Sequence, residues 1–199
     1  FLKSTRTEFQ HLEQVVKHAA LANPDISFRL THNEKEIKHY KKGTLEQRVV
    51  AVLGAHFMKH CSEIEARHQG FHLRGFIGKE AAFRKSTDHQ YFYLNHRPVR
   101  DKIILHAIKN AFYQLGISLE HQHPSFVIYL ECPFSEVDIN VHPTKHEVRF
   151  QEAAWVHDFI QSCLLKALKT HEEKKTALIQ AAKKQMDLPV MEKPLRWRE

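Results

Sequence analysis

The segment of residues 126–150 constrains the fold more than any other part of this 199-residue chain. Residues 126–131 form a near-continuous apolar run, which is typical of a strand that is buried on both faces of a sheet. Residues 136–141 then alternate between apolar and polar side chains, as in a strand with one buried face. Apolar residues resume at Val148. The pattern therefore predicts three strands joined by two tight connections.

The connection between the second and third of these strands carries a lysine. Pro143 cannot donate a ladder hydrogen bond, so we expect the sheet to be interrupted there and Lys145 to be presented on a loop. His142 and His146 flank this loop at H-x-x-x-H spacing. Because the spacing falls on a loop and not on a helical face, we do not expect these histidines to bind a metal ion. From the residues alone, an exposed hairpin lysine is the simplest interpretation of Lys145.

Composition restricts the class of protein and of partner. The hydrophobic fraction of 42% and the charged fraction of 27% are ordinary for a globular chain. No apolar run approaches the roughly 20 residues that cross a bilayer, and no signal peptide opens the chain. A formal charge of +7 and a pI near 9.3 favour an anionic partner, with nucleic acid first, against the alternative of a solvated basic surface.

The cysteines and the first residue indicate the compartment and the context of the chain. Cys61, Cys132 and Cys163 lie far apart and form no C-x-x-C pair. We therefore expect reduced thiols, Cys132 and Cys163 being buried, and a cytoplasmic protein. Phe1 is not a natural start, so we expect the chain to be a piece of something longer.

Hydrophobic periodicity predicts helices and strands in alternation along the rest of the chain. Asp101 is a suitable N-cap for one helix, and Gly116 is suited to the left-handed position that ends it. The helices are predicted at 7–22, from about 45 to 57, at 102–115 and from about 152 onward. The strands are predicted at 26–31, 37–40, 64–66, 71–77 and 90–94, and residues 80–89 are predicted to be a loop.

The motifs of a self-sufficient enzyme are missing. The sequence contains no glycine-rich loop of the two kinds that cradle nucleotide phosphates. No serine–histidine–acid or cysteine–histidine arrangement follows from spacing alone. We therefore expect no catalytic residue and no metal site in this chain by itself. Tyr91 and Tyr93 alternate with Phe92 in a predicted strand, so sheet packing is favoured over stacking on bases.

One basic cluster remains as a candidate binding site. Arg97, Arg100 and Lys102 lie close together, and Lys102 falls in the first turn of the helix that Asp101 caps. The helix dipole disfavours a cation at this end, whereas helix N-termini themselves bind phosphate. Two interpretations stay open from the residues alone. Either these cations contact phosphate, or they are solvated and Asp101 neutralises one of them.

Two stretches resemble the MutL family of DNA mismatch-repair proteins. They are Y-F-Y-L-N-H-R-P-V-R-D-K at 91–102 and D-I-N-V-H-P-T-K-H-E-V-R-F at 138–150, and T-E-F at 7–9 and V-H-D-F-I at 156–160 add to the match. The resemblance covers residues 1–169 and implies the second, transducer domain, which follows an ATPase domain in that family. It implies an α/β sandwich of the ribosomal-protein kind, a mixed sheet with helices packed on it and a left-handed βαβ crossover. Residues 170–199 would be a frayed helix and the start of an interdomain linker.

The resemblance also implies roles for individual residues. Lys145 would reach the γ-phosphate of ATP, which the preceding domain of the parent holds together with Mg²⁺. Lys102 matches the position of a DNA-binding arginine in bacterial relatives, and Arg97 and Arg100 flank it. The family usually has Asn-Gly-Arg at 95–97, whereas this chain has His96 in the middle. Histidine resists the positive φ that glycine allows, so the local turn is expected to be affected.

The implied partners are those of a mismatch-repair ATPase. They are DNA, the preceding ATPase domain, the mismatch-recognition protein MutS, the endonuclease MutH, a helicase, and a second copy of the parent in an ATP-dependent homodimer. Two other functions are compatible with this architecture. The corresponding domain of a type II topoisomerase would carry a Gln-x-Lys-type loop instead of the sequence at 142–146. A stand-alone RNA-binding domain of the ribosomal kind is the other alternative.

Overall fold

The computed structural model describes residues 5–138 and 148–186, with side chains described for 7–138 and 148–169. Residues 1–168 form one compact unit and residues 169–199 a second. Lys145 and its neighbours His142 and His146 lie outside the described residues.

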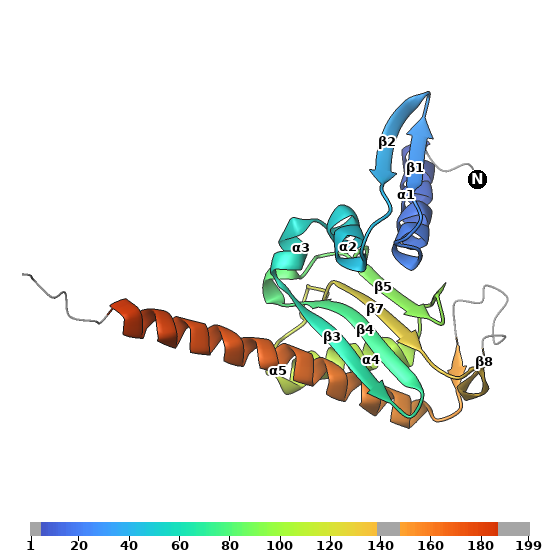
Figure 1. The fold of residues 1–199 in the computed structure, drawn as a ribbon. Helices are drawn as coiled ribbons and strands as arrows, with labels where there is room; N and C mark the ends of the chain where they lie inside the picture. The colour runs from blue at the N-terminus through green and yellow to red at the C-terminus, as the bar shows by residue number, and fades with distance from the viewer. Residues whose placement is uncertain (1–4, 139–147, 187–199) are drawn as a thin grey trace, which may run out of the picture. The chain divides into compact units, whose positions relative to one another are not determined.

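A mixed five-stranded sheet forms the centre of the first unit (Figure 1). Its strand order is β3-β4-β7-β5-β6. β5 and β7 are parallel, and the other neighbouring strands are antiparallel. The predicted mixed sheet is therefore confirmed. The strands are β3 (Cys61–His68), β4 (Phe71–Gly78), β5 (Gln90–Leu94), β6 (Arg97–Pro98) and β7 (Phe126–Glu131).

Strand β7 is the central strand, as its apolar run predicts. Five of its six residues are buried, and only Glu131 is partly exposed. Phe126, Ile128 and Leu130 face one hydrophobic core, whereas Val127 and Tyr129 face another. The alternation of a strand therefore divides the apolar residues between two layers of helices.

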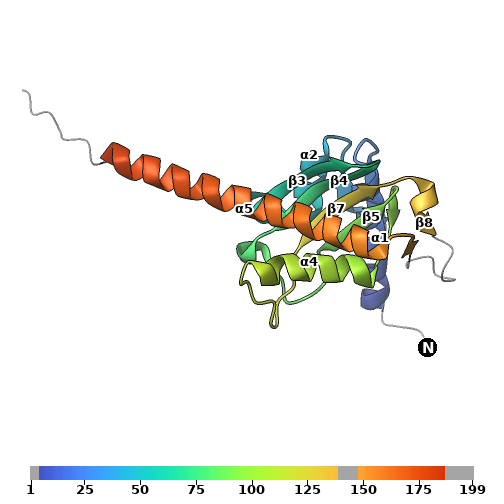
Figure 2. The same ribbon diagram turned by 90° about the horizontal axis from the view of Figure 1, so that it is seen from below.

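Helices cover both faces of this sheet. The helix α4 (Lys102–Gln114) and the part of α5 (Ala153–Met186) that belongs to the first unit pack side by side on one face (Figure 2). Ile104, Ile108, Ile160 and Leu164 on these helices belong to the larger core. The helices α1 (Thr5–Ala22), α2 (Leu45–Leu53) and α3 (Ala55–Lys59) lie on the other side. In the second unit the backbone of α5 stays helical up to Met186.

The segment between β5 and β7 is a crossover connection between parallel neighbours. α4 follows β5 and the short strand β6, and β7 then pairs beside β5 with the same direction. The βαβ crossover that the family resemblance implies is thus present, and its left-handedness stays a prediction.

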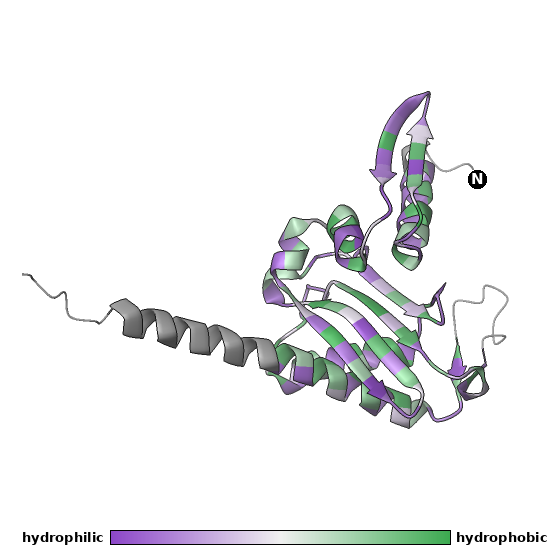
Figure 3. Ribbon diagram, viewed as in Figure 1, coloured by the Kyte–Doolittle hydropathy of each residue, from purple (hydrophilic) through white to green (hydrophobic). Residues whose placement is uncertain are grey.

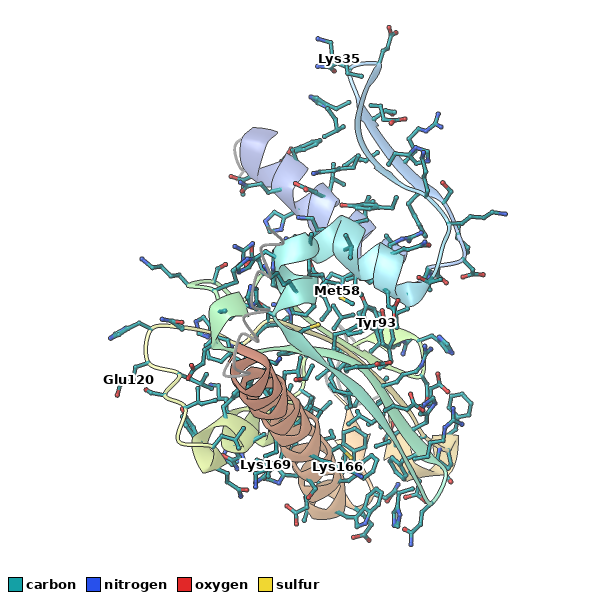
Figure 4. The ribbon with its side chains drawn as sticks, turned by 60° about the vertical axis from the view of Figure 1, so that its left-hand side comes forward. Lys35, Met58, Tyr93, Glu120, Lys166 and Lys169 are labelled. Atoms are coloured by element: carbon teal, nitrogen blue, oxygen red, sulfur yellow. The ribbon has the colours of Figure 1, made fainter. Side chains whose placement is uncertain are left out.

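The N-terminal helix and hairpin differ in part from the predicted pattern. β1 (Phe28–His32) pairs with β2 (Lys35–Tyr40) as predicted, but Ile26 lies outside the strand and is exposed. The hairpin is largely hydrophilic (Figure 3). Periodicity places the apolar residues Leu12 and Val15 of α1 on one face of the helix with Phe9 and Val16. Leu12 and Val15 are nevertheless exposed, because the helix contacts the sheet through other positions. The Tyr91 hydroxyl donates a hydrogen bond to Gln14 Oε1, and the Tyr93 hydroxyl donates to the His18 carbonyl oxygen. Both bonds join the sheet to α1, and Tyr93 is labelled in Figure 4.

A buried arginine holds the end of α1 to the neighbouring loops. The Arg48 side chain on α2 is 1% exposed, and its guanidinium donates to the carbonyl oxygens of Ala20, Asn23, Pro24, Ile26 and Lys41. A cation at the C-terminal end of α1 is also favoured by the helix dipole. Periodicity did not predict this interaction. The Arg48 side chain therefore holds the turn after α1 and the two ends of the β1–β2 hairpin to α2.

Three further boundaries depart from the prediction. The single helix expected from Leu45 to Phe57 is broken at Gly54, whose φ of 93° ends α2, and Phe57 lies on α3 but still in the core. A short 3₁₀ turn, η1 (Glu80–Ala82), interrupts the predicted loop. Another, η2 (Phe134–Glu136), includes Glu136, the first residue of the strand expected at 136–141. Within the described residues, β8 (Val137–Asp138) pairs with β9 (Arg149–Phe150), and residues 139–141 of the expected strand lie outside the described ranges.

Within the ranges that the structure describes, no helix has both the length and the apolar character that crossing a bilayer requires.

Substituting Gly75→Ala is expected to lower the free energy of unfolding by about 3 kcal/mol or more. Gly75 has a φ of 135°, and an added Cβ would lie 2.1 Å from the Val127 carbonyl oxygen on the adjacent strand β7. Urea unfolding checks the change. The matched control is Gly116→Ala, where φ is 74° but nothing lies within 4 Å, so only the backbone cost of about 1 kcal/mol is expected. Equal losses in the two variants would contradict the close approach of β4 to β7.

Candidate nucleic-acid interface

The candidate interface begins at the tight turn between β5 and β6. Leu94 pairs with Arg97, and the two residues between them, Asn95 and His96, have φ values of 46° and 66°. Positive φ at both central residues is the signature of a type I′ turn, whose twist suits a two-residue hairpin. His96 therefore adopts a positive φ, which a residue with a Cβ resists, so the effect of replacing the family's glycine stays a prediction about the cost of this turn.

The side chain of Asn95 fastens this turn to the end of β7. Its amide nitrogen donates to the Cys132 carbonyl at 3.1 Å, and its amide oxygen accepts from the Cys132 backbone nitrogen at 2.9 Å. The backbone nitrogen of Asn95 also donates to the Leu130 carbonyl at 2.9 Å. These three hydrogen bonds place the turn, and the start of β6 after it, at a fixed position beside the central strand.

The segment from β6 to the first turn of α4 carries the predicted cations. Arg97, Arg100 and Lys102 are all exposed, and they are called the cationic segment below. Between them, Val99 is 4% exposed and packs in the larger core, so the backbone is anchored while the cations project outward. All three predicted residues are thus found on one continuous stretch of surface.

Asp101 does not neutralise its neighbours. Its side chain is buried, and one carboxylate oxygen accepts hydrogen bonds from the backbone nitrogens of Ile103 at 2.8 Å and Ile104 at 3.2 Å. This is the predicted N-cap of α4, which satisfies two otherwise unpaired helix N–H groups. In the part of the chain that the structure describes, no carboxylate forms an ion pair with Arg97, Arg100 or Lys102. The carboxylate nearest in sequence is therefore committed to the helix, and the three positive charges stay available.

A groove lies next to Lys102, between the first turns of α4 and α5. It has a volume of about 440 Å³ and is lined by Lys102, Ile103, His106, Ala153, Ala154 and His157. His106 Nδ1 and His157 Nε2 are 3.2 Å apart across it, and the Asn110 amide lies within 3.4 Å of both rings. The sequence analysis missed this pair of histidines. The spacing of His106 and Asn110, four residues apart on one helix, is the only local signal of it.

Nucleophilic and metal chemistry find no support among the described side chains. Burial raises the pKa of the Cys61 and Cys132 thiols to about 11, and it also raises that of Cys163, so these thiols stay protonated at neutral pH. The same residues contain no group of three or more histidine, cysteine or carboxylate side chains that could hold a metal ion.

The position of the predicted phosphate sensor is bracketed in sequence by β8 and β9. Val137 pairs with Phe150, and Asp138 pairs with Arg149. Val137, Val148 and Phe150 are buried in the larger core, as the alternation predicted. Lys145 itself lies between these strands in the sequence and outside the described residues, so its role stays a prediction.

The fold defines the class of protein first: an α/β domain built on a mixed five-stranded sheet with helices on both faces. The chain is similar to a crystal structure of the N-terminal domain of a DNA repair protein, with 22% identity and a TM-score of 0.68 over 88% of this chain and 56% of that one. It is also similar to the ATPase domain of Aquifex aeolicus MutL carrying a lysine-to-asparagine substitution, with 22% identity and a TM-score of 0.56 over 82% and 54% of the two chains. At this identity the likeness shows the fold alone.

Sequence comparison identifies the family. The family model described as "DNA mismatch repair protein, C-terminal domain" matches residues 49–169. The DNA mismatch repair protein MutL of Mannheimia succiniciproducens is 43% identical over 177 residues, which are 86% of this chain and 28% of that protein. The chain therefore belongs to the MutL family of DNA mismatch-repair proteins, and it spans less than a third of the length of this relative.

Substituting His96→Gly is expected to raise the free energy of unfolding by about 1 kcal/mol, because glycine adopts the φ of 66° without the cost that a Cβ imposes. Urea unfolding measures the change. His96→Ala is the matched control, since alanine removes the imidazole but keeps the Cβ, and it is expected to bring no comparable gain. If the alanine variant gains as much as the glycine variant, the imidazole and not the backbone is the source of the cost.

Proposed function

We propose that residues 1–169 are the transducer domain of a MutL-type mismatch-repair ATPase, with residues 170–199 beginning the linker that follows. In this proposal the cationic segment binds the DNA backbone, and Lys145 contacts the γ-phosphate of ATP in a preceding domain. The family membership and the likeness to ATPase-region folds support this assignment. They also favour it over a topoisomerase domain or a ribosomal-type RNA-binding domain.

The DNA-binding part of the proposal rests on the hydrogen bonds of the Asp101 carboxylate. Because its carboxylate accepts from the first turn of α4, it does not pair with Arg100 or Lys102 on either side of it in the sequence. Two of the three cations thus frame a capped helix N-terminus, and Arg97 extends the charge along β6. Cations on rigid elements, without aimed base-reading groups, suit contact with phosphates. Such binding is independent of base sequence and sensitive to salt.

The proposed role of Lys145 is that of a sensor. A lysine that reaches a triphosphate gains a charge-assisted contact only while that phosphate is present, and it can therefore couple the nucleotide state to the position of the transducer domain. The preceding domain of the parent would hold ATP and Mg²⁺, so this chain alone is not expected to hydrolyse ATP. An ATP-dependent homodimer of the parent follows from the same coupling.

The wider assembly is proposed from family membership. The parent would act in the cytoplasm on DNA, together with the mismatch-recognition protein MutS, the endonuclease MutH and a helicase. The 43% identity to a MutL protein supports this part of the proposal.

Substituting Lys102→Glu is expected to weaken the binding of a short DNA duplex, because one phosphate contact is lost and a repulsive charge is added. The slope of log affinity against log salt concentration is expected to become shallower by about one to two. Fluorescence anisotropy at several salt concentrations measures both effects. The matched control is Lys35→Glu at the tip of the β1–β2 hairpin, which makes the same change in net charge (Figure 4). If the two variants lose the same affinity, binding depends on net charge alone and Lys102 is not part of the site.

Substituting Lys145→Ala in the full-length parent is expected to reduce ATP hydrolysis or ATP-driven dimerisation, because the sensor contact with the γ-phosphate is lost. Steady-state hydrolysis and analytical ultracentrifugation with a non-hydrolysable ATP analogue measure the two activities. Lys35→Ala, which removes a lysine from the hairpin tip, is the control. Normal hydrolysis and normal dimerisation of the Lys145 variant would together reject the sensor role.

A further inference from the structure

A partly enclosed pocket of about 140 Å³ lies between β5, the connection from β6 to α4, and the first turn of α4. Its inner wall is apolar and consists of side chains that are at most 5% exposed, namely Phe92, Val99, Ile104 and Phe126. Because this wall belongs to the core, the pocket exists before any ligand binds. Thr87 and Arg100 also line the pocket and are exposed, which places them at its rim. Arg100 belongs to the cationic segment as well, so the pocket and the segment are continuous.

Two polar side chains of the lining offer unoccupied hydrogen-bond acceptors. The Gln90 amide is fixed, because its nitrogen donates to the Pro124 carbonyl at 3.0 Å. The Asp101 side chain is only 8% exposed, and one of its carboxylate oxygens caps α4. Among the described residues, the other Asp101 oxygen and the Gln90 amide oxygen accept no hydrogen bond. The free Asp101 oxygen is not sealed from solvent, so a ligand in the pocket can reach it.

The size and lining of the pocket suit a single six-membered ring that carries a hydrogen-bond donor. An engineered apolar cavity of about 150 Å³ holds one benzene molecule, so a pocket of about 140 Å³ accommodates one ring and not the two fused rings of a purine. A pyrimidine base is such a ring, and it arrives attached to the phosphates that the cationic segment suits. Carboxylates accept from the exocyclic amine of cytosine, whereas thymine has a carbonyl oxygen at that position.

We propose that this pocket binds one unstacked cytosine of single-stranded DNA, whose neighbouring phosphates contact Arg100 and Lys102. The exocyclic amine of the base donates to the free oxygen of Asp101, and the ring packs on the apolar wall. This inference rests on the proposed DNA-binding function and extends it to a second form of DNA. In a duplex the bases are stacked and paired, so they do not enter the pocket, and duplex binding stays independent of sequence.

The test compares hexanucleotides that are abasic at every position or at every position except one. The wholly abasic strand reports the phosphate contacts, and the strand with one central cytosine adds the pocket. By fluorescence anisotropy, the wild-type chain is expected to bind the cytosine strand about tenfold more tightly, which is the scale of one base contact. A strand with one adenine is expected to gain much less, because two fused rings exceed the pocket. Equal affinity for the cytosine and abasic strands would overturn the inference, and normal duplex binding would then leave the proposed function standing.

A ring placed at the rim is expected to block the pocket. Thr87→Phe is expected to lower the ratio of the cytosine-strand affinity to the abasic-strand affinity from about ten to about one. Thr31→Phe makes the same exchange at an exposed position of β1 and is expected to keep the wild-type ratio. A ratio of about ten that persists in the Thr87 variant would contradict binding in this pocket.

An exchange of Asp101 tests the hydrogen bond to the base without removing the helix cap. Asparagine caps helices as well as aspartate does, so Asp101→Asn is expected to keep the stability of the fold. Its amide nitrogen takes the place of the free carboxylate oxygen and donates instead of accepting. The preference is therefore expected to change from the cytosine strand to a strand with one thymine. An unchanged preference for cytosine would exclude Asp101 as the group that recognises the base.

A last measurement separates failure of the pocket from failure of the proposed function. If the wild-type chain binds neither a duplex nor the abasic strand, the DNA-binding proposal fails, and deoxycytidine monophosphate becomes the probe for the pocket alone. It is expected to shift the methyl NMR signals of Ile104 and Leu105, which line the pocket, and deoxyadenosine monophosphate is expected to shift them much less. Absence of any shift with deoxycytidine monophosphate would reject the pocket as a base site.

Discussion

The whole arrangement depends on the pairing of β7 with two neighbours while both of its faces are buried. It hydrogen-bonds to β4 on one side and to β5 on the other, and its side chains alternate between two cores. A shift of one residue would exchange the two faces, so the register is strongly determined. Gly75 belongs to the same constraint, because only a residue without a Cβ allows β4 to lie so close to Val127. The residues that hydrogen-bond at the ends of β7 are therefore held at fixed positions relative to the sheet.

The cationic segment is one of the features attached in this way. Asn95 binds Cys132 just beyond the end of β7, and Val99 and the capping carboxylate of Asp101 are buried a few residues later. Because these positions must face inward, the residues between them face outward. The exposure of Arg100 and Lys102 is therefore a consequence of packing and capping. The contacts that fold the unit therefore also leave these cations exposed.

The sequence predicted those features whose cause is local or repeats along the chain. The apolar run of 126–131 and the cap at Asp101 are of this kind, and both are observed. The departures have causes that lie far away in the sequence. Val15 sits on an apolar stripe but is exposed, because the burial of one helix face depends on which element packs against it. The contact between His106 and His157 joins two helices about fifty residues apart, so the periodicity of either helix does not predict it. The role of Lys145 came from family resemblance and stays a prediction.

Net charge alone does not locate a candidate binding surface, because the basic side chains of this chain have different structural roles. Arg48 is buried and donates to carbonyl oxygens, so its charge serves the fold. Arg74 lies over the ring of Tyr129 and pairs with Glu131 at 3.4 Å, which leaves little of its charge for a ligand. By contrast, Arg100 and Lys102 stand on either side of a carboxylate that the backbone already occupies. What distinguishes a candidate phosphate site here is the commitment of the neighbouring acid to a helix cap, because that commitment removes the competitor an incoming phosphate would otherwise have to displace.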